Sequence, residues 1–216
     1  MSPLAFLARP RRWLDAMSRF GGTISGGPNF AFDACARRIA ESELEGLDLG
    51  AWRVAFNGAE PVSPATLEAF AARFASVGFR RQALMPVYGL AENSVGLAFA
   101  PLGRGPTTLS IDRQTWMKTG RAEDADRADA EPLSLPSCGL PIPGHQIRIV
   151  DPAGRELPER REGRLQFQGP SACTGYLGNA EATKALFHGD WLDSGDLAFV
   201  FGGEVYVTGR AKDMIV

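Results

Sequence analysis

Two short polar motifs in this chain contain residue types that could hold a nucleotide. The first follows the apolar run 52–56 and consists of Asn57, Gly58, Ala59, Glu60 and Pro61. The second follows the apolar run 83–87 and consists of Tyr88, Gly89, Leu90, Ala91 and Glu92. A loop of small residues can place backbone amides and carbonyls against a purine edge, an aromatic ring can stack on its face, and a glutamate can bind Mg²⁺. Each motif alone is also ordinary turn chemistry, so the functional interpretation depends on the pair.

The segment between the two motifs predicts a helix. Ser63 is a good N-cap, and Pro64 suits the first helical position because no amide donor is needed there. Gly78 marks the end of an apolar face formed by Leu67, Phe70, Phe74 and Val77. The order strand, loop, helix, strand, loop is an α/β unit, and such units bind ligands at the carboxyl ends of their strands. Both motifs are at such ends.

Two later motifs suit the sugar of a nucleotide. The segment 191–197 reads W-L-D-S-G-D-L and places Asp196 after a glycine at the start of an expected strand. A carboxylate there can accept hydrogen bonds from both hydroxyls of a ribose. The segment 208–213 reads T-G-R-A-K-D and follows the expected strand 204–207. It contains Arg210 and Lys212.

In this order, N-G-A-E-P, Y-G-L-A-E, W-L-D-S-G-D and G-R-A-K-D resemble the nucleotide-site motifs of the adenylate-forming, acyl-activating superfamily. That superfamily includes acyl-CoA synthetases, luciferases and the adenylation domains of peptide synthetases. The resemblance extends over residues 2–216 and is strongest to the fatty acyl-AMP ligases, in which Ala91 is usual. The segment 25–30 is similar to the fatty-acyl pocket segment of those ligases, which assigns Gly26, Gly27, Pro28, Asn29 and Phe30 to an acyl pocket.

The resemblance implies a function for each motif. Glu92 would be the metal ligand, with ATP or AMP and Mg²⁺ as cofactors, and Lys212 would lie at an interdomain hinge. The nucleotide-binding residues would be Gly58, Ala59, Glu60, Pro61, Tyr88, Gly89, Leu90, Ala91, Asp196 and Arg210. The substrates would be a fatty acid and ATP, and the partner would be an acyl carrier protein or the missing part of the ligase. The sequence departs from the family pattern at Ser194, Leu140 and Arg164, and none of these removes an implied nucleotide contact.

The family also needs parts for which this sequence has no match. Adenylation requires amides and cations that stabilise the charge developing on the phosphates. Family members supply a Ser/Thr/Gly-rich loop ending in lysine and a second lysine on a mobile C-terminal domain, and neither is found, so no catalytic residue is assigned. We expect a piece of a fatty acid adenylating ligase that is inactive alone. A piece of an acyl-CoA synthetase and a non-catalytic nucleotide-binding or interaction module are the alternatives.

Composition places the chain among ordinary globular proteins. It is 44% hydrophobic and 22% charged, and its net charge of −2 gives no reason to expect a nucleic-acid partner. The basic residues Arg9, Arg11 and Arg12 are interpreted as a solvated helix end. Three widely spaced cysteines without metal spacing indicate reduced thiols and a cytoplasmic location. The apolar runs are all shorter than the roughly 20 residues of a membrane span, and no signal peptide is found.

The predicted fold class is α/β, with a partial Rossmann-like α/β subdomain followed by a small β-rich subdomain resembling a distorted barrel. The expected divisions are an α/β part over 1–119, an exposed loop over 120–136, a β-rich part over 137–208 and the start of a hinge over 209–216. Period-two patterns predict strands at 146–150, 164–168, 197–201 and 204–207. Gly202-Gly203 predicts a hairpin turn, and Asn179 is expected to cap a helix over 180–187.

Near the start of the chain, Gly26-Gly27-Pro28 is expected to form a turn and Asn29 to cap a helix whose inner face includes Phe32, Cys35 and Ile39. Phe30 and Phe32 could be core residues or the wall of an acyl tunnel. If part of the large domain is missing, we expect this inner face to be exposed, together with a second apolar stripe formed by Trp13, Met17 and Phe20.

Overall fold

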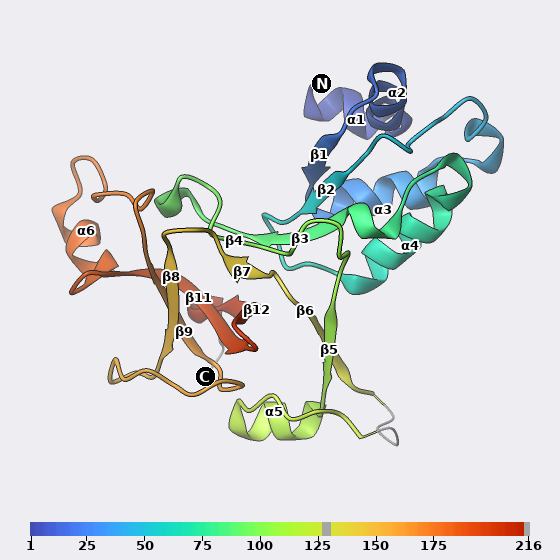
Figure 1. Ribbon diagram of the computed structural model, residues 1–216. Coiled ribbons are helices and arrows are strands. Elements are labelled where there is room, and N and C mark those ends of the chain that lie inside the picture. Colours follow the sequence, from blue (N-terminus) through green and yellow to red (C-terminus); the bar gives the residue numbers. More distant parts are fainter. Residues whose placement is uncertain (127–130, 214–216) are drawn as a thin grey trace. The chain divides into compact units, whose positions relative to one another are not determined.

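The computed structural model describes residues 1–126 and 131–213, and the chain folds into two compact units (Figure 1). The first unit contains Met1–Pro86 and Ala100–Thr107, and the second contains Val87–Phe99 and Thr108–Val216. The chain therefore passes between the units within a strand, and this division differs from the expected one, which grouped residues 1–119 together. None of the helices in the described part of the chain combines the length and the apolar composition of a membrane span.

The first unit is built on parallel strands in the order β1, β2, β3. Strands β1 (Ile24–Gly27) and β2 (Val54–Asn57) pair in register from Ile24 opposite Val54 to Gly27 opposite Asn57. The first residues of β3 (Leu84–Tyr88) pair with β2 on its other side. Helices and single turns of 3₁₀ helix complete the unit: α1 (Pro3–Ala8), α2 (Arg11–Phe20), α3 (Asn29–Arg38), η1 (Glu41–Glu43), α4 (Pro64–Phe74), η2 (Ala75–Val77) and η3 (Arg81–Ala83).

Helix α4 confirms the expected start and end signals. Ser63 Oγ accepts a hydrogen bond from the Thr66 amide at 3.3 Å, and Pro64 occupies the first turn. Leu67, Phe70 and Phe74 are buried, as the apolar spacing predicts. The helix tightens into η2 before Gly78, whose φ of +85° ends it.

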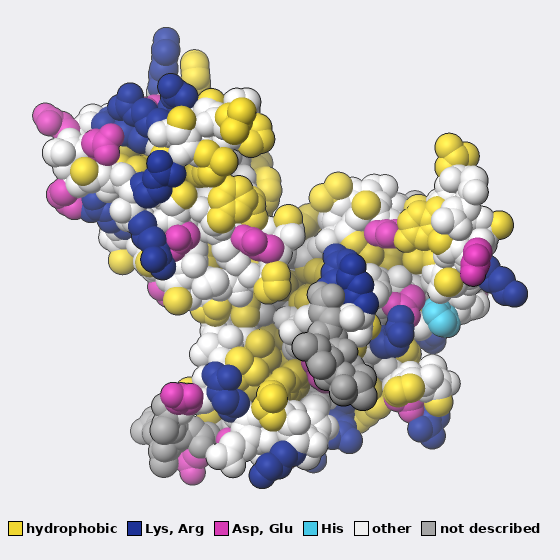
Figure 2. Space-filling view, turned by 180° about the vertical axis from the view of Figure 1, so that it is seen from behind, with side chains coloured by type: hydrophobic (Ala, Val, Ile, Leu, Met, Phe, Trp, Pro, Cys, Tyr) yellow, Lys and Arg dark blue, Asp and Glu magenta, His cyan; other side chains and the backbone are white. Residues whose placement is uncertain are grey.

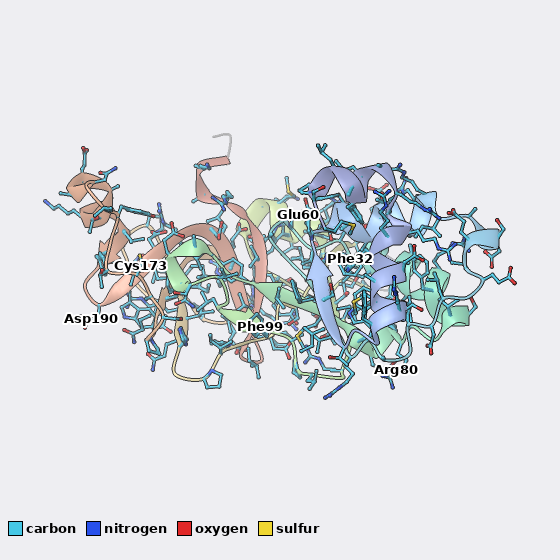
Figure 3. All side chains as sticks on the ribbon, turned by 90° about the horizontal axis from the view of Figure 1, so that it is seen from above. Phe32, Glu60, Arg80, Phe99, Cys173 and Asp190 are labelled. Atoms are coloured by element: carbon cyan, nitrogen blue, oxygen red, sulfur yellow. The ribbon has the colours of Figure 1, made fainter. Side chains whose placement is uncertain are left out.

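The core of the first unit is aromatic. Phe32 on α3 contacts Phe70 on α4 edge-on, with ring centroids 4.9 Å apart, and lies among the surrounding helices and strands (Figure 3). Trp52 and Trp13 make a similar contact at 5.1 Å. This packing buries an apolar face of α3 formed by Phe32, Cys35 and Ile39.

The expectation that this face would be exposed is therefore wrong, because α4 covers it. Of the second stripe, Met17 is buried, Trp13 is partly buried, and Phe20 is 74% exposed. Two further expectations near β1 are wrong. Gly26 and Gly27 belong to strand β1 and not to a turn. Pro28, and not Asn29, occupies the N-cap position of α3, and no side chain makes a capping hydrogen bond there.

The second unit is β-rich, as predicted, and its main sheet is antiparallel in the order β10, β11, β9, β8, with β12 on β11. Its strands are β8 (Gln146–Val150), β9 (Gly163–Gln168), β10 (Phe187–His188), β11 (Trp191–Phe201) and β12 (Glu204–Arg210). Register shifts interrupt β11 between Asp193 and Leu197 and again after Leu197, and such irregularities bend a strand and curl its sheet. Gly202 and Gly203 form the predicted hairpin turn, with φ of 60° and 78°.

Shorter elements complete the second unit: β4 (Ala98–Phe99), η4 (Ala91–Asn93), β5 (Thr108–Ile111), α5 (Arg113–Thr119), β6 (Leu133–Pro136), β7 (Leu140–Pro141), α6 (Ala180–Leu186) and η5 (Ala211–Asp213). Asn179 caps α6 as predicted, because its Oδ1 accepts from the Ala182 amide. Basic and acidic side chains are intermixed over the visible surface of the described residues (Figure 2).

The segment 120–136 is more structured than the exposed loop that was expected. Ala122 is fully buried with Ile111 and Phe199, and its amide donates to the carbonyl of Arg160 at 2.9 Å. Residues 133–136 form β6, which pairs with β5. The small side chain of Ala122 fits against the aromatic cluster of the second unit, which contains Phe199, Tyr206 and Trp116. The polar composition of the segment predicts exposure and therefore did not indicate this burial. Residues 127–130 lie outside the described part of the chain.

Candidate functional site

In the first unit, the loop 57–61 follows directly from the end of β2. Asn57 is fully buried, and its Nδ2 donates to the carbonyl of Gly27 at 3.1 Å, joining the ends of neighbouring parallel strands. Ala59 has a φ of 69°, a left-handed conformation that is uncommon for alanine. Gly58 is buried, whereas Ala59, Glu60 and Pro61 are exposed. The tip of the loop is therefore accessible while its base is held by the sheet.

The predicted acyl segment lies beside this loop. Asn29 Oδ1 accepts from the amide of Ser63 at 3.1 Å, and Asn29 Nδ2 donates to the carbonyl of Pro61. The amide of Phe30 donates to Glu60 Oε1 at 3.1 Å. Parallel strands end at the same edge of a sheet, so the segments that follow β1 and β2 meet there. Asn29 therefore bonds to the neighbouring loop instead of capping its own helix.

Two residues of the acyl segment have distinct structural requirements. A Cβ at Gly26 would lie 2.1 Å from the carbonyl oxygen of Phe56, so only glycine allows this strand pairing. Phe30 is 52% exposed, in contrast to the fully buried Phe32. Of the two phenylalanines left open by the sequence, Phe32 is thus a core residue and Phe30 presents its ring at the surface of the described structure.

In the second unit, three residues from separate motifs come together. Tyr88, at the end of β3, donates its hydroxyl to Asp196 Oδ2 at 2.6 Å. Arg210 Nε lies 3.0 Å from Asp196 Oδ1. Strands β11 and β12 set this arrangement, because Asp196 and Arg210 are register partners in that pair. Asp196 lies within a longer strand than predicted and is buried, as is Tyr88.

Burial is the largest influence on the pKa values of Asp196 and Tyr88 in this cluster. It raises the pKa of the Asp196 carboxyl above its ordinary value, and the negative charges of Glu92 and Asp193 add to that effect. The hydrogen bond from Tyr88 and the positive charge of Arg210 favour the carboxylate and lower the pKa. Burial, followed by the charge of Asp196, also raises the pKa of Tyr88, so its hydroxyl remains a donor. The Tyr88 donor and the Arg210 cation thus partly offset the cost of burying the carboxylate.

A second buried carboxylate, Asp193, precedes the first on β11. Its Oδ2 lies 2.8 Å from Arg164 Nε and 3.7 Å from His188 Nε2, and its Oδ1 accepts from the amide of Gly195. Arg164, one of the departures from the family pattern, is thus the ion-pair partner of a motif residue. Ser194, another departure, donates to the carbonyl of Leu165 at 2.8 Å and accepts from the Asp196 amide. Its hydroxyl therefore supports the irregular part of β11 just before Asp196.

Glu92 is half-buried in the single turn η4. Its Oε1 accepts a hydrogen bond from the Tyr176 hydroxyl at 2.6 Å, and this bond is the main reason that the pKa of Tyr176 rises to about 12. Among the described residues there is no cluster of three or more His, Cys, Asp or Glu able to hold a metal. Mg²⁺ commonly uses one or two carboxylates together with substrate phosphates, so Glu92 fits a magnesium held jointly by protein and nucleotide.

The residues before Glu92 form its supporting loop. A Cβ at Gly89 would lie 1.6 Å from the carbonyl oxygen of Val95, so the chain requires glycine there. Leu90 is partly buried and Ala91 is exposed. Lys212, the predicted hinge residue, is exposed in η5 at the end of the described chain.

The predicted site residues thus form two groups, one in each unit. The first unit brings together the acyl segment 26–30 and the loop 58–61, and the second brings together Tyr88, Asp196 and Arg210. Sequence reasoning missed the hydroxyl of Tyr176 and the partner of Arg164. Neither has a local signal, because each contact joins residues far apart in the chain.

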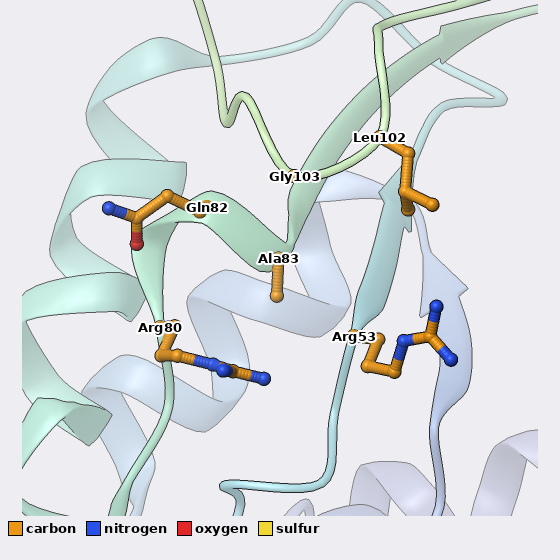
Figure 4. Close-up of a pocket in the computed structure, with 6 residues that line it drawn as sticks. All are labelled: Arg53, Arg80, Gln82, Ala83, Leu102 and Gly103. Atoms are coloured by element: carbon orange, nitrogen blue, oxygen red, sulfur yellow. The ribbon is translucent and has the colours of Figure 1, made fainter.

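Two hollows lie in the described structure, one in each unit. One, of about 450 Å³, is in the first unit and is lined by residues that include Arg53, Arg80 and Ala83 (Figure 4). It lies at the amino ends of β2 and β3, opposite the loop 57–61. The other, of about 970 Å³, is an open groove in the second unit whose lining includes Asp193 and His188.

Comparison with known proteins gives a consistent match. The family model described as AMP-binding enzyme matches residues 1–177. The chain is 39% identical over 229 residues to 4-hydroxyphenylalkanoate adenylyltransferase of Mycobacterium marinum, covering 100% of this chain and 36% of that protein. It is 39% identical over 227 residues to a medium-chain-fatty-acid–[acyl-carrier-protein] ligase of Moorena producens, covering 100% of this chain and 38% of that protein.

A solved structure agrees with these sequence matches. The fold is similar to that of a fatty acyl-adenylate ligase from L. pneumophila in complex with acyl adenylate and pyrophosphate, with a TM-score of 0.93 and 38% identity. That match covers 99% of this chain and 38% of the solved chain. The chain thus spans less than two-fifths of the length of these relatives.

Proposed function

Because the chain belongs to the family of AMP-binding enzymes, we propose that it supplies adenosine- and acyl-binding residues of an ATP-dependent fatty acid adenylating ligase. In that reaction a fatty acid carboxylate attacks the α-phosphorus of ATP, forming acyl-AMP and releasing pyrophosphate. The observation that carries the proposal is the contact of Asp196 with both Tyr88 and Arg210, which brings three separate sequence motifs into one cluster.

Asp196 is the proposed ribose ligand. Each of its oxygens accepts from one protein donor, and a carboxylate oxygen can accept more than one hydrogen bond. The remaining lone pairs can therefore accept from the two ribose hydroxyls. Arg210 favours the ionised form, which makes such hydrogen bonds stronger than those to a neutral acid. Tyr88 is held by its hydroxyl, which sets the orientation of the ring on which a purine would stack.

Glu92 is the proposed magnesium ligand. When bound, Mg²⁺ neutralises negative charge on the phosphates of ATP. The role of this chain is to hold the Glu92 carboxylate in a defined position at the end of the loop that follows Tyr88. The backbone of Glu92 is itself held, because its carbonyl accepts from the Cys173 amide at 2.7 Å.

The acyl group is proposed to contact the segment 26–30. The partly exposed ring of Phe30 offers apolar surface, and the backbone around it is held through Asn29 and Glu60. The similar proteins include a ligase of medium-chain fatty acids, which supports a carboxylic acid with an apolar tail as substrate. The same relative is named as a ligase of a fatty acid and an acyl carrier protein, and we propose a carrier protein as the acceptor for the complete ligase here.

Binding of AMP to the 216-residue chain tests the nucleotide part. Hydrogen bonds to charged groups contribute about 1.5–3 kcal/mol, so Asp196→Ala should weaken AMP binding roughly 10- to 100-fold by calorimetry. Tyr88→Ala should also weaken it, through loss of the stacking surface. Asp190→Ala is the matched control, because Asp190 is an exposed carboxylate one residue before β11 (Figure 3). Equal affinities in Asp196→Ala and Asp190→Ala would refute the assignment.

The chain alone should bind AMP without forming acyl-AMP at a useful rate. Its sequence contains no Ser/Thr/Gly-rich loop ending in lysine, and phosphate-charge stabilisation supplies several kcal/mol in such reactions. Pyrophosphate release from ATP and a fatty acid measures this. Turnover comparable with that of a complete family member would show that the 216 residues suffice. A purely nucleotide-binding role, the second candidate, predicts AMP binding that stays unchanged when a fatty acid is added.

A further inference from the structure

The segment 171–176 is attached to the loop that contains Glu92 by several hydrogen bonds. The Cys173 amide donates to the carbonyl of Glu92 at 2.7 Å, and Ser94 Oγ donates to the carbonyl of Ser171 at 3.0 Å. The Tyr176 hydroxyl donates to Glu92 Oε1 at 2.6 Å. All of these residues belong to the second unit. Glu92 is thus held at its backbone and at its side chain by the same segment.

Building on the proposed role of Glu92, we propose that Tyr176 is a positioning residue that orients the Glu92 carboxylate toward a magnesium–nucleotide complex. The phenol engages Oε1 only. Among the described residues no protein hydrogen bond or ion pair is made to Oε2, which leaves that oxygen for the cation. A carboxylate held by one hydrogen bond loses less rotational freedom when it binds a metal, and such outer partners commonly change metal affinity 10- to 100-fold.

The backbone at Tyr176 is arranged to direct the side chain. Its amide donates to Thr183 Oγ1 at 2.8 Å, which ties it to α6. Gly175 has a φ of 134°, and a Cβ there would lie 2.5 Å from the Thr183 methyl carbon. The close approach of the chain to α6 therefore fixes the backbone position from which the Tyr176 side chain extends.

Packing does not account for the position of Tyr176. The residue is 41% exposed and belongs to none of the buried clusters of the second unit. Its neighbour Leu177 is fully exposed. Ordering a half-exposed tyrosine side chain costs conformational entropy. The clearest consequence of its hydrogen bond to the carboxylate is that the Glu92 side chain is held in one orientation.

The test compares the affinity of the full 216-residue chain for ATP with Mg²⁺ and for ATP with a chelator, by calorimetry. The measured quantity is the ratio of the two affinities in each variant. We expect Tyr176→Phe to lower this ratio about 10-fold, because the ring is kept and only the donor is lost. Glu92→Gln should abolish most of the magnesium effect, and the double variant should lose no more than Glu92→Gln alone.

Leu177→Ala is the control, because it perturbs the same segment at a side chain exposed to solvent and should leave the ratio unchanged. A wild-type ratio in Tyr176→Phe, together with a lowered ratio in Glu92→Gln, would overturn the role of Tyr176 alone. A wild-type ratio in both variants would overturn the magnesium role of Glu92 and this inference with it. Failure of the wild-type chain to bind AMP would refute the proposed function itself, which separates the two failures.

Discussion

Replacing Tyr88 by phenylalanine should destabilise the second unit by about 1.5–3 kcal/mol. The hydroxyl lies 2.6 Å from Asp196 Oδ2, and both side chains are buried. Phenylalanine keeps the ring, so no cavity forms and the loss is confined to one hydrogen bond with a charged acceptor. Arg210, paired with the other oxygen, remains and limits the effect.

The size of this effect should depend on pH in a defined direction. Because the folded-state pKa of Asp196 is raised, its contribution to stability is fully present below the ordinary value of 3.8 and is lost as pH rises through the folded pKa. The Tyr88 hydrogen bond limits that rise, so Tyr88→Phe raises the pKa further. The deficit of the variant should therefore be small in acid and grow toward neutral pH.

Urea unfolding followed by circular dichroism, at about pH 3.5 and about pH 7, measures both effects. A double-mutant cycle with Asp196→Asn isolates the pair, since the loss of the Arg210 ion pair is common to both variants that carry the asparagine. A coupling energy above about 1 kcal/mol at neutral pH is expected. Additivity within about 0.5 kcal/mol, or a deficit that is larger in acid, would refute the proposed energetics of the Tyr88–Asp196 pair.

In the folded chain, Cys35 and Cys138 should resist alkylation while the partly exposed Cys173 reacts, because burial raises the pKa of each of the first two thiols to about 12; equal rates at all three would contradict this. Those thiols have a pKa of about 9.0 in the unfolded chain, so the free energy of unfolding should fall between about pH 9 and 12 by about 1.4 kcal/mol per pH unit for each thiol. In urea unfolding, the Cys35→Ala variant should show a smaller dependence of this free energy on pH. Asn29→Ala should cost about 1–3 kcal/mol and make the adjoining loop more sensitive to proteolysis, because the amide of Ser63 loses its acceptor; unchanged cleavage would argue against this role. Ser63→Ala should cost about 1 kcal/mol in the same unfolding assay through loss of the helix cap, and a wild-type midpoint would rule the cap out as a source of stability.

Much of the fold was predictable because its signals are local. The cap of Ser63, the left-handed Gly78 and the Gly202-Gly203 turn depend on the conformations open to one or two residues. The sequence therefore predicts where α4 begins, where its 3₁₀ extension η2 ends and where β11 turns into β12. The apolar run before Tyr88 likewise places the second motif at the end of β3. Alternation indicated the strands of the second unit, although β11 is longer than predicted.

Local signals failed where a contact with a distant segment decided the position of a side chain. Asn29 is a good helix cap by residue type. Its side-chain Oδ1 instead accepts a hydrogen bond from the backbone amide of Ser63, 34 residues away in the loop that follows the parallel neighbour β2. Ala122 lies in a polar segment that predicts exposure, yet its small volume fits against the aromatic cluster of the second unit. In both cases the winning contact depends on which segments the tertiary fold brings together.

The sequence by itself therefore determined the site's components, namely the motifs, their order and, for the first two motifs, their places at strand ends. The tertiary structure decided their partners. Tyr176 meets Glu92 across 84 residues, and Arg164 meets Asp193 across 29. The Arg164–Asp193 pair depends on the register of β9 against β11 and on the irregularity in β11, because a shift of one residue turns a side chain to the opposite face of the sheet. Short-range residue preferences carry no information about that register.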